Sequence, residues 1–528
     1  RLDENANIVL FERGPDVSFA NCGMPYYLGG EITSRDKMLV AKPELLRGRF
    51  RIDVRVCAEV TRIDRANKEI TWRDVNTKSE RNESYDFLIL SPGASPIRPP
   101  IPGVDLPFVH VLRSLADMDQ IRSRIDLGAK RVLVVGAGFI GLEVAESLTH
   151  LGIKVTVVEL QDQVLPPLDA EMTTPIAQTL MKNGVELILS DSAARFEDAG
   201  TGGSVVLTSG RRIETDMVLL GVGVRPDNGL AKEAGLELGT RGGIKVDRHM
   251  RTNDPFVYAV GDAVETVDFV TGQPTQVPLA GPANRQGRIA ADNILGIATE
   301  YRGTQGTAIV RVFDRVAALT GQSEKLLLRA AKPFRKIYVH PAHHASYYPG
   351  AEQMTLKLLF DEADGRVLGA QAVGGAGVDK RIDVLAMAIQ AKMTVYDLEE
   401  AELCYAPPFG SAKDPVNMAG FVAANLLRGI HPQTVAENYS PEHSPQGQFV
   451  IDVRTAREFA EGHLPEAINI PVDELRDRLA EIRHDQPITV YCQVGQRGYL
   501  ATRILQQQGY RVSNVSGGYK TYCLYHTE

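Results

Sequence analysis

Hydrophobic residues in this chain fall into short continuous runs and into longer stretches with an apolar residue every three or four positions. The clearest pair begins with the run RVLVV (residues 131–135), which predicts a buried strand, and continues in residues 142–148, which have the helical period. Gly152 ends this helix, and residues 154–159 contain the next apolar run. Strand, helix and strand in this order predict a βαβ unit of an α/β domain.

Other apolar runs end in glycine-containing turns. Residues 52–92 alternate short apolar and polar runs, which predicts antiparallel strands, and the last run enters Ser91, Pro92 and Gly93. Two later runs enter Gly223 and the pair Gly261-Asp262. A buried strand that runs into such a turn lets the backbone approach a ligand closely. We therefore expect ligand contacts at these turns, although an acid such as Asp262 is, taken alone, more typical of a solvated turn.

The N-terminal pattern resembles the interior of a nucleotide-binding unit. An apolar run at residues 8–11 ends in Glu12. In a dinucleotide-binding βαβ unit this is the second strand, and its acid binds the adenosine ribose. The first strand and the glycine-rich phosphate loop would lie about 20 residues earlier. We expect that such a strand, loop and part of a helix precede Arg1; the alternative is a surface strand without this role.

Composition narrows the possible function classes. At 528 residues the chain can form several domains, since single cores stop growing beyond about 250–300 residues. A net charge of −8 and a pI near 5.9 provide no basic surface for nucleic acid. Apolar runs are interrupted well before the roughly 20 residues that a membrane span needs. Five scattered cysteines do not form a disulfide framework, so we expect a reducing, cytoplasmic setting.

A dinucleotide fingerprint follows the strand at residues 131–135. Gly136, Gly138 and Gly141 form G-x-G-x-x-G between this strand and the helix, and Glu159 ends the next strand. The glycines permit a tight turn, close approach of a pyrophosphate and packing of helix on strand. A carboxylate at Glu159 accepts hydrogen bonds from a ribose 2′-hydroxyl and repels a 2′-phosphate, so NADH is favoured over NADPH. We expect Gly223 to border the nicotinamide.

Cys22 lies in the segment SFANCGMPY (residues 18–26), shortly after the apolar run at residues 8–11. A thiol placed where a strand passes into a loop can face a planar redox cofactor on one side and a substrate on the other, and it reacts as the thiolate. The alternative is a buried structural cysteine. The nucleotide-binding patterns and a second cysteine loop favour the redox role.

The second cysteine loop lies near the C-terminus. Residues 449–454 and 488–491 predict strands, and the latter runs directly into CQVGQRG (residues 492–498), which opens a helix. Loop N–H groups and the helix N-terminus would converge on the sulfur of Cys492, and Arg497 adds positive charge. Such a loop stabilises a thiolate and can cradle an anionic persulfide.

The order of these motifs resembles that of the pyridine nucleotide-disulphide oxidoreductases. The resemblance implies an α/β chain with two Rossmann-like nucleotide-binding domains, for FAD (residues 1–112 and 225–302) and NAD(P)H (113–224), and an α+β dimerisation domain (303–427). It also implies a homodimer. A single cysteine in the segment around Cys22 is similar to the branch that contains coenzyme A-disulfide reductase, NADH oxidase and NADH peroxidase; members like glutathione reductase carry a cysteine pair.

The same resemblance implies roles for individual residues. Tyr347 and Tyr405 match tyrosines that reach the partner's cysteine across the dimer, where a phenol can protonate a leaving thiolate; an ordinary half-buried aromatic or turn aromatic is the alternative for each. Ser18 and Asn21 match positions that line the coenzyme A thiol site. Beside the turns named above, the implied cofactor contacts are Glu12, Arg13, Pro278, Leu279 and Ala280 for FAD and Ile140 for NADH.

The stretch 447–528 resembles a single α/β rhodanese domain, by its Cys492–Arg497 loop and by DVR, GHL and AINIP, after a proline-containing linker at 428–446. Rhodanese folds kept only for docking usually lack the cysteine. The fusion implies NADH-driven reduction of coenzyme A persulfide, coenzyme A disulfide or polysulfide at Cys22, with sulfur transfer at Cys492. An NADH oxidase or peroxidase that uses a sulfenic acid, and a sulfur-relay protein, are the alternatives. The cluster His340, His343 and His344 lacks a carboxylate or cysteine partner, so we expect no metal site.

Overall fold

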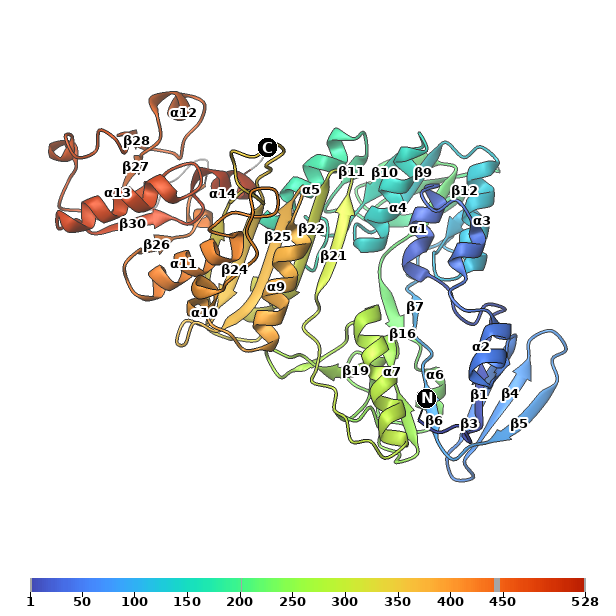
Figure 1. Ribbon diagram of the computed structural model, residues 1–528. Coiled ribbons are helices and arrows are strands. Elements are labelled where there is room, and N and C mark those ends of the chain that lie inside the picture. Colours follow the sequence, from blue (N-terminus) through green and yellow to red (C-terminus); the bar gives the residue numbers. More distant parts are fainter. Residues whose placement is uncertain (1, 201, 441–446, 527–528) are drawn as a thin grey trace. The chain divides into compact units, whose positions relative to one another are not determined.

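The computed structural model describes residues 2–200, 202–440 and 447–526. The chain forms two compact units (Figure 1). The first unit contains Arg1–Asp162 and Met181–Thr304, and the second contains Gln163–Leu180 and Gln305–Glu528. Among the described residues, no helix has the length and apolar character that crossing a membrane requires.

A parallel five-stranded sheet forms the predicted dinucleotide-binding part of the first unit. Its strands, in the order β11-β10-β9-β15-β8, are Glu186–Ile188, Lys154–Val158, Arg131–Val135, Met217–Leu220 and Val109–His110. Helix α4 (Phe139–His150) connects β9 to β10, which pair in parallel. Val132–Val135 are buried because both faces of a parallel sheet are covered. The predicted βαβ unit is confirmed.

The rest of the first unit is built from small sheets. Strand β1 (Ile8–Phe11) pairs in parallel with β2 (Ile52–Arg55), and β6 (Leu88–Leu90) pairs in parallel with β18 (Val257–Ala259). Only β3 (Ala58–Asp64), β4 (Glu69–Asp74) and β5 (Glu80–Ser84) form the antiparallel sheet expected across residues 52–92. That expectation was therefore wrong for β2 and β6, whose partners lie elsewhere in the sequence.

Further elements complete this unit. Its other helices are α1 (Met24–Leu28), α2 (Pro43–Phe50), α3 (Leu115–Asp126), α6 (Gly229–Glu233) and α7 (Ala280–Ile294). Its other strands are β7 (Ala94–Pro96), β12 (Ala193–Asp198), β13 (Gly203–Leu207), β14 (Arg212–Thr215), β16 (Val224–Pro226), β17 (Ile244–Lys245), β19 (Val264–Val267) and β20 (Pro274–Thr275).

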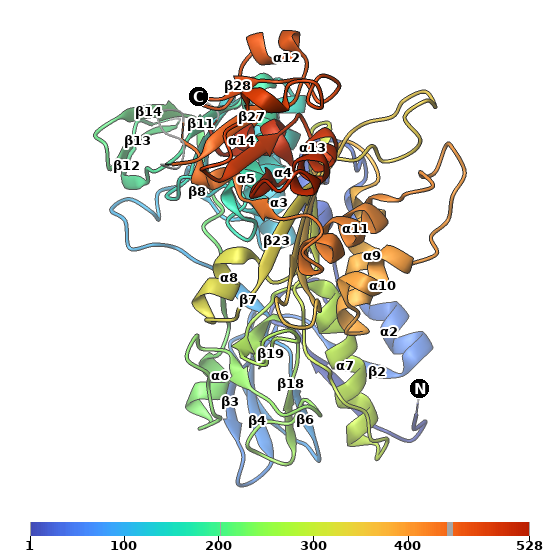
Figure 2. The same cartoon turned by 90° about the vertical axis from the view of Figure 1, so that its left-hand side faces the viewer.

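The second unit contains an antiparallel sheet in the order β21-β22-β25-β24-β23, with bounds Ala308–Val312, Arg315–Gly321, Val367–Gly374, Thr355–Phe360 and Arg335–Val339. Helices α9 (Val378–Gln390), α10 (Val395–Glu400) and α11 (Pro415–Leu427) lie on one side of this sheet (Figure 2). Strand β24 coincides with the apolar run at residues 355–360, and helix α9 includes the apolar residues at 384–389. Short helix α8 (Glu324–Arg329) follows β22.

A parallel sheet in the order β26-β30-β29-β27-β28 follows, with bounds Gln433–Thr434, Val512–Val515, Ile488–Tyr491, Phe449–Asp452 and Ile468–Asn469. Its helices are α12 (Ala456–Ala460), α13 (Gln496–Gln507) and α14 (Gly518–Tyr525). Strand β26 pairs with β30, and Ala436 and Tyr439 are core residues, so much of the segment 428–446 expected as a linker belongs to this domain. Residues 441–446 of that segment lie outside the described residues.

A buried lysine lies in the second unit. Lys357 on β24 is 0% exposed, and its Nζ donates to Asp169, Glu171 and Glu324 at 2.8, 2.6 and 2.7 Å. The three carboxylates also have the mutual spacing of a metal site among the described residues. The ammonium group in their midst neutralises part of their charge and ties helix α5 (Ala170–Lys182), through its residues up to Leu180, to the sheet.

Helix α14 joins the last domain to the antiparallel sheet. Thr521 on α14 hydrogen-bonds to Nε2 of His340 at 2.8 Å, and the hydroxyls of Tyr525 and Tyr338 are 2.8 Å apart. The backbone N–H of Tyr338 donates to Ser516 Oγ at 3.0 Å. Burial lowers the pKa of His340 to about 3, so the ring is neutral and serves as a hydrogen-bonding group.

Candidate functional site

The three glycines of the fingerprint have distinct surroundings. Gly136 has φ +103°, and a Cβ there would lie 2.5 Å from the Gly221 carbonyl oxygen; a Cβ at Gly141 would lie 2.1 Å from the Gly136 oxygen. A Cβ at Gly138 would have no heavy atom within 4 Å. Two glycines thus allow the turn and the packing of α4, while Gly138 faces open space that a pyrophosphate can enter.

Glu159 is fixed beside this loop. Its side chain is buried; Oε2 accepts the Ala137 N–H at 2.8 Å, and Oε1 accepts the Gln161 N–H at 2.9 Å. Helix α4 begins after Gly138 without a side-chain cap, so its first N–H groups are free for a phosphate oxygen. Ile140, on the first turn, is 46% exposed. These residues fit a dinucleotide.

The predicted FAD turns lie at one end of the β6–β18 pair. Because these strands are parallel and Val260 N donates to Leu90 O at 2.9 Å, the turn Ser91–Gly93 lies beside Gly261 and Asp262. Gly93 has φ +73°, and a Cβ there would lie 2.8 Å from Arg113 Nη2. The structure thus brings together two motifs that are far apart in the sequence: Gly93 and Gly261 are separated by 168 positions.

Asp262 and the start of α7 complete this cluster. Burial raises the pKa of Asp262, and Arg113 opposes that shift. Gly261 N donates to Gln286 of α7 at 2.7 Å. Helix α7 begins after Pro278 and Leu279 without a side-chain cap, which leaves N–H groups for an acceptor. Half-buried polar groups, positive-φ glycines and an uncapped helix fit a flavin nucleotide.

The other predicted cofactor residues have local partners. Glu12 accepts the Gly14 N–H at 2.6 Å, and Arg13 is largely exposed, 4.0 Å from Glu59. Gly223 has φ +103° in the turn after β15, where its carbonyl accepts the Ile97 N–H.

Cys22 lies in a short 3₁₀ turn (Asn21–Gly23) and is exposed. Helix α1 follows at once and packs on α4: Tyr26 Oη donates to Glu143 Oε1 at 3.1 Å, and a Cβ at Gly29 would lie 2.8 Å from Ser147. Burial raises the pKa of Glu143, against the effect of the Tyr26 hydrogen bond. The segment that contains Cys22 therefore packs on the helix that follows the glycine loop, a contact that sequence patterns do not reveal.

The two candidate coenzyme A contacts lie close to Cys22 along the chain. Asn21 is exposed, whereas Ser18 is half-buried, and the Ser18 carbonyl accepts the Val40 N–H at 3.1 Å. Both remain predictions.

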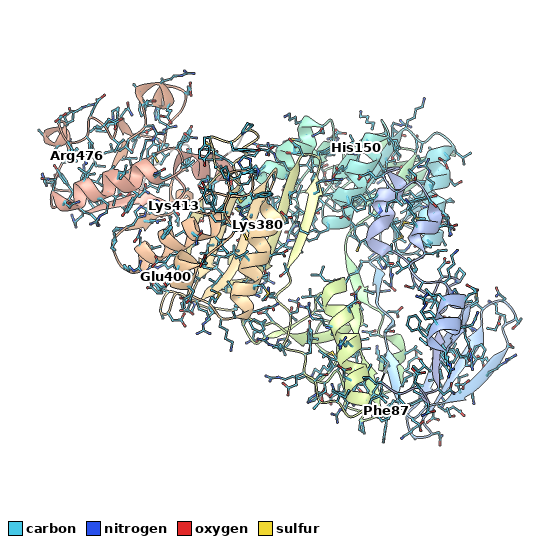
Figure 3. The ribbon with its side chains drawn as sticks, viewed as in Figure 1. Phe87, His150, Lys380, Glu400, Lys413 and Arg476 are labelled. Atoms are coloured by element: carbon cyan, nitrogen blue, oxygen red, sulfur yellow. The ribbon has the colours of Figure 1, made fainter. Side chains whose placement is uncertain are left out.

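Tyr347 and Tyr405 come from loops 58 residues apart, and their hydroxyls are 3.1 Å apart. They are 74% and 51% exposed, and the hydrogen bond raises the pKa of Tyr347. The loop of Tyr405 is fixed by the buried Arg381–Asp414 pair at 2.7 Å, and by Lys380, labelled in Figure 3, whose Nζ donates to the Phe409 carbonyl at 3.5 Å. Because the two exposed hydroxyls are hydrogen-bonded to each other, either phenol can donate a proton to a group that approaches them.

Cys492 follows β29 and is buried. Gly495 N donates to its Sγ at 3.2 Å, and Gly495 has φ +106° as it begins α13. The Cys492 carbonyl accepts the Tyr519 N–H at 2.8 Å. The loop therefore directs the Gly495 N–H, at the start of α13, toward the sulfur, and an N–H in this position favours a thiolate.

Arg497 has a partner that the sequence reasoning missed. Its Nη atoms donate to both Glu458 oxygens at 2.6 and 2.7 Å, and these bonds, with a smaller effect of Cys492, raise the pKa of Arg497. Glu458 also closes a capping box with Thr455 at the start of α12. The T-x-x-E spacing could have predicted this helix start, but not the ion pair with a residue 39 positions later.

Comparison with known proteins identifies the domains. The model for pyridine nucleotide-disulphide oxidoreductases matches residues 1–287, and the dimerisation domain of that family matches 307–415. The chain belongs to the pyridine nucleotide-disulphide oxidoreductases. A rhodanese-like domain matches residues 434–524, a range that begins at Thr434, the second residue of β26. The expected fold class, with two nucleotide-binding domains, a dimerisation domain and a rhodanese domain, is confirmed.

Several named members of this oxidoreductase family are similar over most of the chain. Coenzyme A disulfide reductase of Staphylococcus aureus is 36% identical over 80% of this chain and 95% of its own length. Reduced CoADR-RHD of Bacillus anthracis is 46% identical, with a TM-score of 0.97 over 99% of this chain and 94% of that chain. An NAD-dependent persulfide reductase from A. fulgidus is 36% identical, with a TM-score of 0.91 over 99% and 96%.

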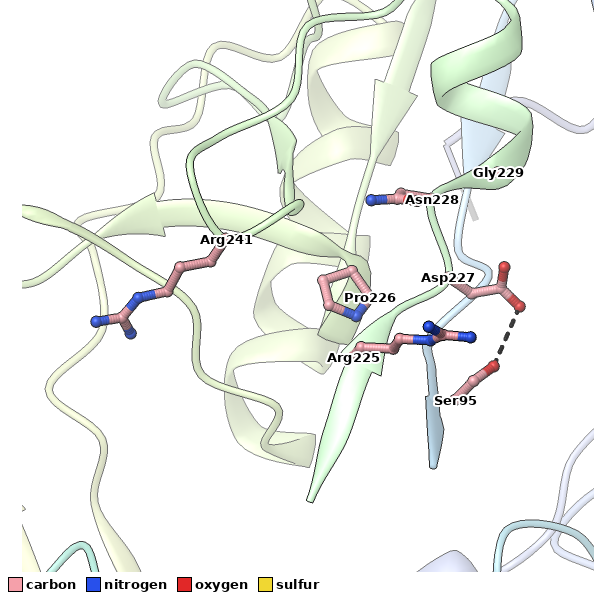
Figure 4. Close-up of a pocket in the computed structure, with 7 residues that line it drawn as sticks. All are labelled: Ser95, Arg225, Pro226, Asp227, Asn228, Gly229 and Arg241. Atoms are coloured by element: carbon pink, nitrogen blue, oxygen red, sulfur yellow. Dashed lines mark hydrogen bonds between the residues drawn. The ribbon is translucent and has the colours of Figure 1, made fainter. Parts of the chain in front are cut away.

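This oxidoreductase also has a pocket beside β16, shown in Figure 4. Ser95 Oγ donates to Asp227 at 3.5 Å, and Asn228 donates to the Gly242 carbonyl at 2.6 Å. Arg225 and Arg241 complete the charged lining. Neither reactive-cysteine candidate lines this pocket, so its position alone assigns it no part in thiol chemistry.

Proposed function

We propose that this oxidoreductase uses NADH and FAD to reduce coenzyme A persulfide, coenzyme A disulfide or polysulfide at Cys22, and that Cys492 transfers sulfane sulfur to or from the same thiol carrier. The observation that carries the proposal is the exposed Cys22 in the turn just before α1, a helix that packs on α4 through Tyr26 and Glu143. The names of the similar proteins and the rhodanese-like domain support the choice of sulfur substrates.

At Cys22 the chain's own contribution is a nucleophile. The thiolate attacks the sulfur of a coenzyme A disulfide, forms a mixed disulfide and releases one coenzyme A thiolate. With a persulfide, attack on the inner sulfur releases hydrosulfide instead. Bound FAD supplies the two-electron link between NADH and this disulfide. Two electrons and a proton then regenerate the Cys22 thiolate and free coenzyme A.

In the proposed homodimer, Tyr347 and Tyr405 serve the cysteine of the partner subunit. Their hydroxyls share a hydrogen bond, so one phenol can give its proton to a leaving thiolate while the other keeps it oriented. Ser18 and Asn21 would contact the coenzyme A thiol end.

The chain would hold its cofactors with the groups described above. The glycine loop and the uncapped start of α4 would bind the pyrophosphate of NADH, and Glu159 would bind its adenosine ribose. Gly93, Gly261 and Asp262 would contact FAD.

At Cys492 the proposed reaction is sulfur transfer without net redox change. The thiolate attacks the outer sulfur of a persulfide, a Cys492 persulfide forms, and the carrier thiolate leaves. All five cysteines lie in the described part of the chain and none of them forms a disulfide, which suits action in a reducing, cytoplasmic compartment.

Anaerobic turnover tests this function. The purified flavoprotein should oxidise NADH with coenzyme A persulfide or disulfide as the only acceptor, and faster than it does with O₂ or peroxide. Faster turnover with O₂ or peroxide would instead support an oxidase or peroxidase in which Cys22 becomes a sulfenic acid.

A further inference from the structure

Two arginines face the Cys492 loop, and a carboxylate neutralises each. Arg497 makes the two-point ion pair with Glu458 at 2.6 and 2.7 Å. Arg454 is buried, donates to buried Asp452 at 2.7 Å and to Gln493, the residue after Cys492, at 3.0 Å. The net charge of the two pairs is zero.

The other basic groups near the loop have hydrogen-bond partners outside it. The loop CQVGQR contains no lysine or second arginine. Lys520, on the helix whose start packs against the loop, donates its Nζ to Gln353 at 2.9 Å. His463 Nδ1 hydrogen-bonds to the Leu464 carbonyl, and its ring stacks on Phe459. The remaining attraction for an anion comes from the loop N–H groups and the start of α13, which act as about half a positive charge.

We propose that Glu458 determines donor specificity at Cys492: by cancelling the charge of Arg497, it disfavours dianionic donors such as thiosulfate and leaves the persulfides of thiols as the preferred donors. This inference rests on the sulfur-transfer function proposed for Cys492. Glu458 acts through Arg497, so it is a specificity-determining residue rather than a catalytic one.

The two donors differ in charge at the reacting end. Attack of the Cys492 thiolate on the outer sulfur of thiosulfate forms a Cys492 persulfide and releases sulfite, which carries both negative charges of the donor. Attack on a thiol persulfide forms the same product and releases one thiolate. The loop N–H groups can compensate one negative charge on the leaving group. Sulfite carries a second negative charge, which would lie beside the Glu458 carboxylate because this carboxylate is paired with Arg497.

Glu458→Gln removes the charge and preserves the local fold. Glu458 accepts the Thr455 N–H at 3.0 Å as the third residue of α12, and glutamine also completes this capping box. Glu458→Asp keeps the charge and shortens the side chain. Glu461→Gln is the matched control, because Glu461, at the C-terminal end of the same helix, is exposed and pairs with the exposed Arg457 at 3.0 Å.

The assay measures thiocyanate formed when cyanide removes sulfur from the Cys492 persulfide, without NADH, with thiosulfate or coenzyme A persulfide as donor. In Glu458→Gln we expect kcat/KM for thiosulfate to rise by about tenfold or more, mainly through KM, and that for the persulfide to change less than about threefold. Glu458→Asp and Glu461→Gln should keep the parent preference.

Three results overturn the inference: an unchanged donor ratio in Glu458→Gln, an equal change for both donors, or the same shift in Glu458→Asp. The first and third would show that the charge does not set specificity, and the second would show a structural role. Failure of the proposed function is separately visible, because protein-dependent thiocyanate formation, above the direct reaction of cyanide with the donor, would then be equal in the parent and in Cys492→Ser.

Discussion

Glu159 provides a sharp test of the proposed dinucleotide site. Its two carboxylate oxygens accept the N–H groups of Ala137 and Gln161, so the side chain is fixed before any ligand binds. Glu159→Ala removes the acceptor for the ribose 2′-hydroxyl and the charge that opposes a 2′-phosphate. A hydrogen bond to a charged group contributes about 1.5–3 kcal/mol, and about 1.4 kcal/mol is a factor of ten. The ratio of kcat/KM for NADH to that for NADPH should fall at least about tenfold.

Glu159→Gln separates the two effects. Its amide has one oxygen, so one of the two backbone N–H groups loses its acceptor and the loop should bind both dinucleotides more weakly. The ratio should still fall, because the negative charge is gone. Steady-state NADH and NADPH oxidation with coenzyme A disulfide measures this ratio. Asp162→Asn, an exposed position three residues later, is the control for loss of one charge and should leave the ratio unchanged. An unchanged ratio in Glu159→Ala would refute the assignment of Glu159 to the ribose.

Two further predictions concern charge in the second unit. Lys357→Met removes the ammonium partner of the buried carboxylates of Asp169 and Glu171, while Glu324 keeps its pair with Lys336, and it should lower the free energy of unfolding by about 3–5 kcal/mol, read from urea midpoints. Lys332→Met, which removes a partly exposed pair with Asp361, should cost less than about 1 kcal/mol; equal effects would show that the Lys357 cluster is not stabilising. The Arg497 hydrogen bonds lower the pKa of Glu458 to about 2, so the ion pair is fully formed above its unfolded pKa and lost only as pH falls toward 2. The ratio of kcat/KM for thiosulfate to that for coenzyme A persulfide should therefore differ between Glu458→Gln and the parent by the same factor at every pH from about 5.5 to 8. A strong dependence of this factor on pH would contradict the ion pair.

The sequence predicts this molecule best where function depends on neighbours along the chain. The glycine loop with Glu159, and the loop that joins Cys492 to α13, are contiguous strand–turn–helix motifs, and the structure has them as expected. Their local geometry follows from glycine positions and apolar runs alone.

Contacts between distant segments could not be predicted in this way. The pairing of Tyr26 with Glu143, of Arg497 with Glu458 and of Lys357 with its acids depends on tertiary packing rather than on spacing. Strand β6 likewise pairs with a distant strand, β18: Leu88 is paired with Val257, which lies 169 residues later in the chain. Strand β26 was missed because two residues carry too little periodicity to be recognised.

Anaerobic oxidation of NADH by coenzyme A persulfide, compared among the parent chain, Cys22→Ser and Cys492→Ser, tests the central claim most directly. A serine hydroxyl does not ionise at neutral pH and so does not attack sulfur. In Cys22→Ser, NADH should therefore still reduce the flavin, but the enzyme should not oxidise NADH continuously with the persulfide as acceptor. Cys492→Ser should retain most of the parent rate with this freely diffusing substrate. Loss of turnover in Cys492→Ser together with full activity in Cys22→Ser would contradict the account and show that the rhodanese cysteine performs the chemistry.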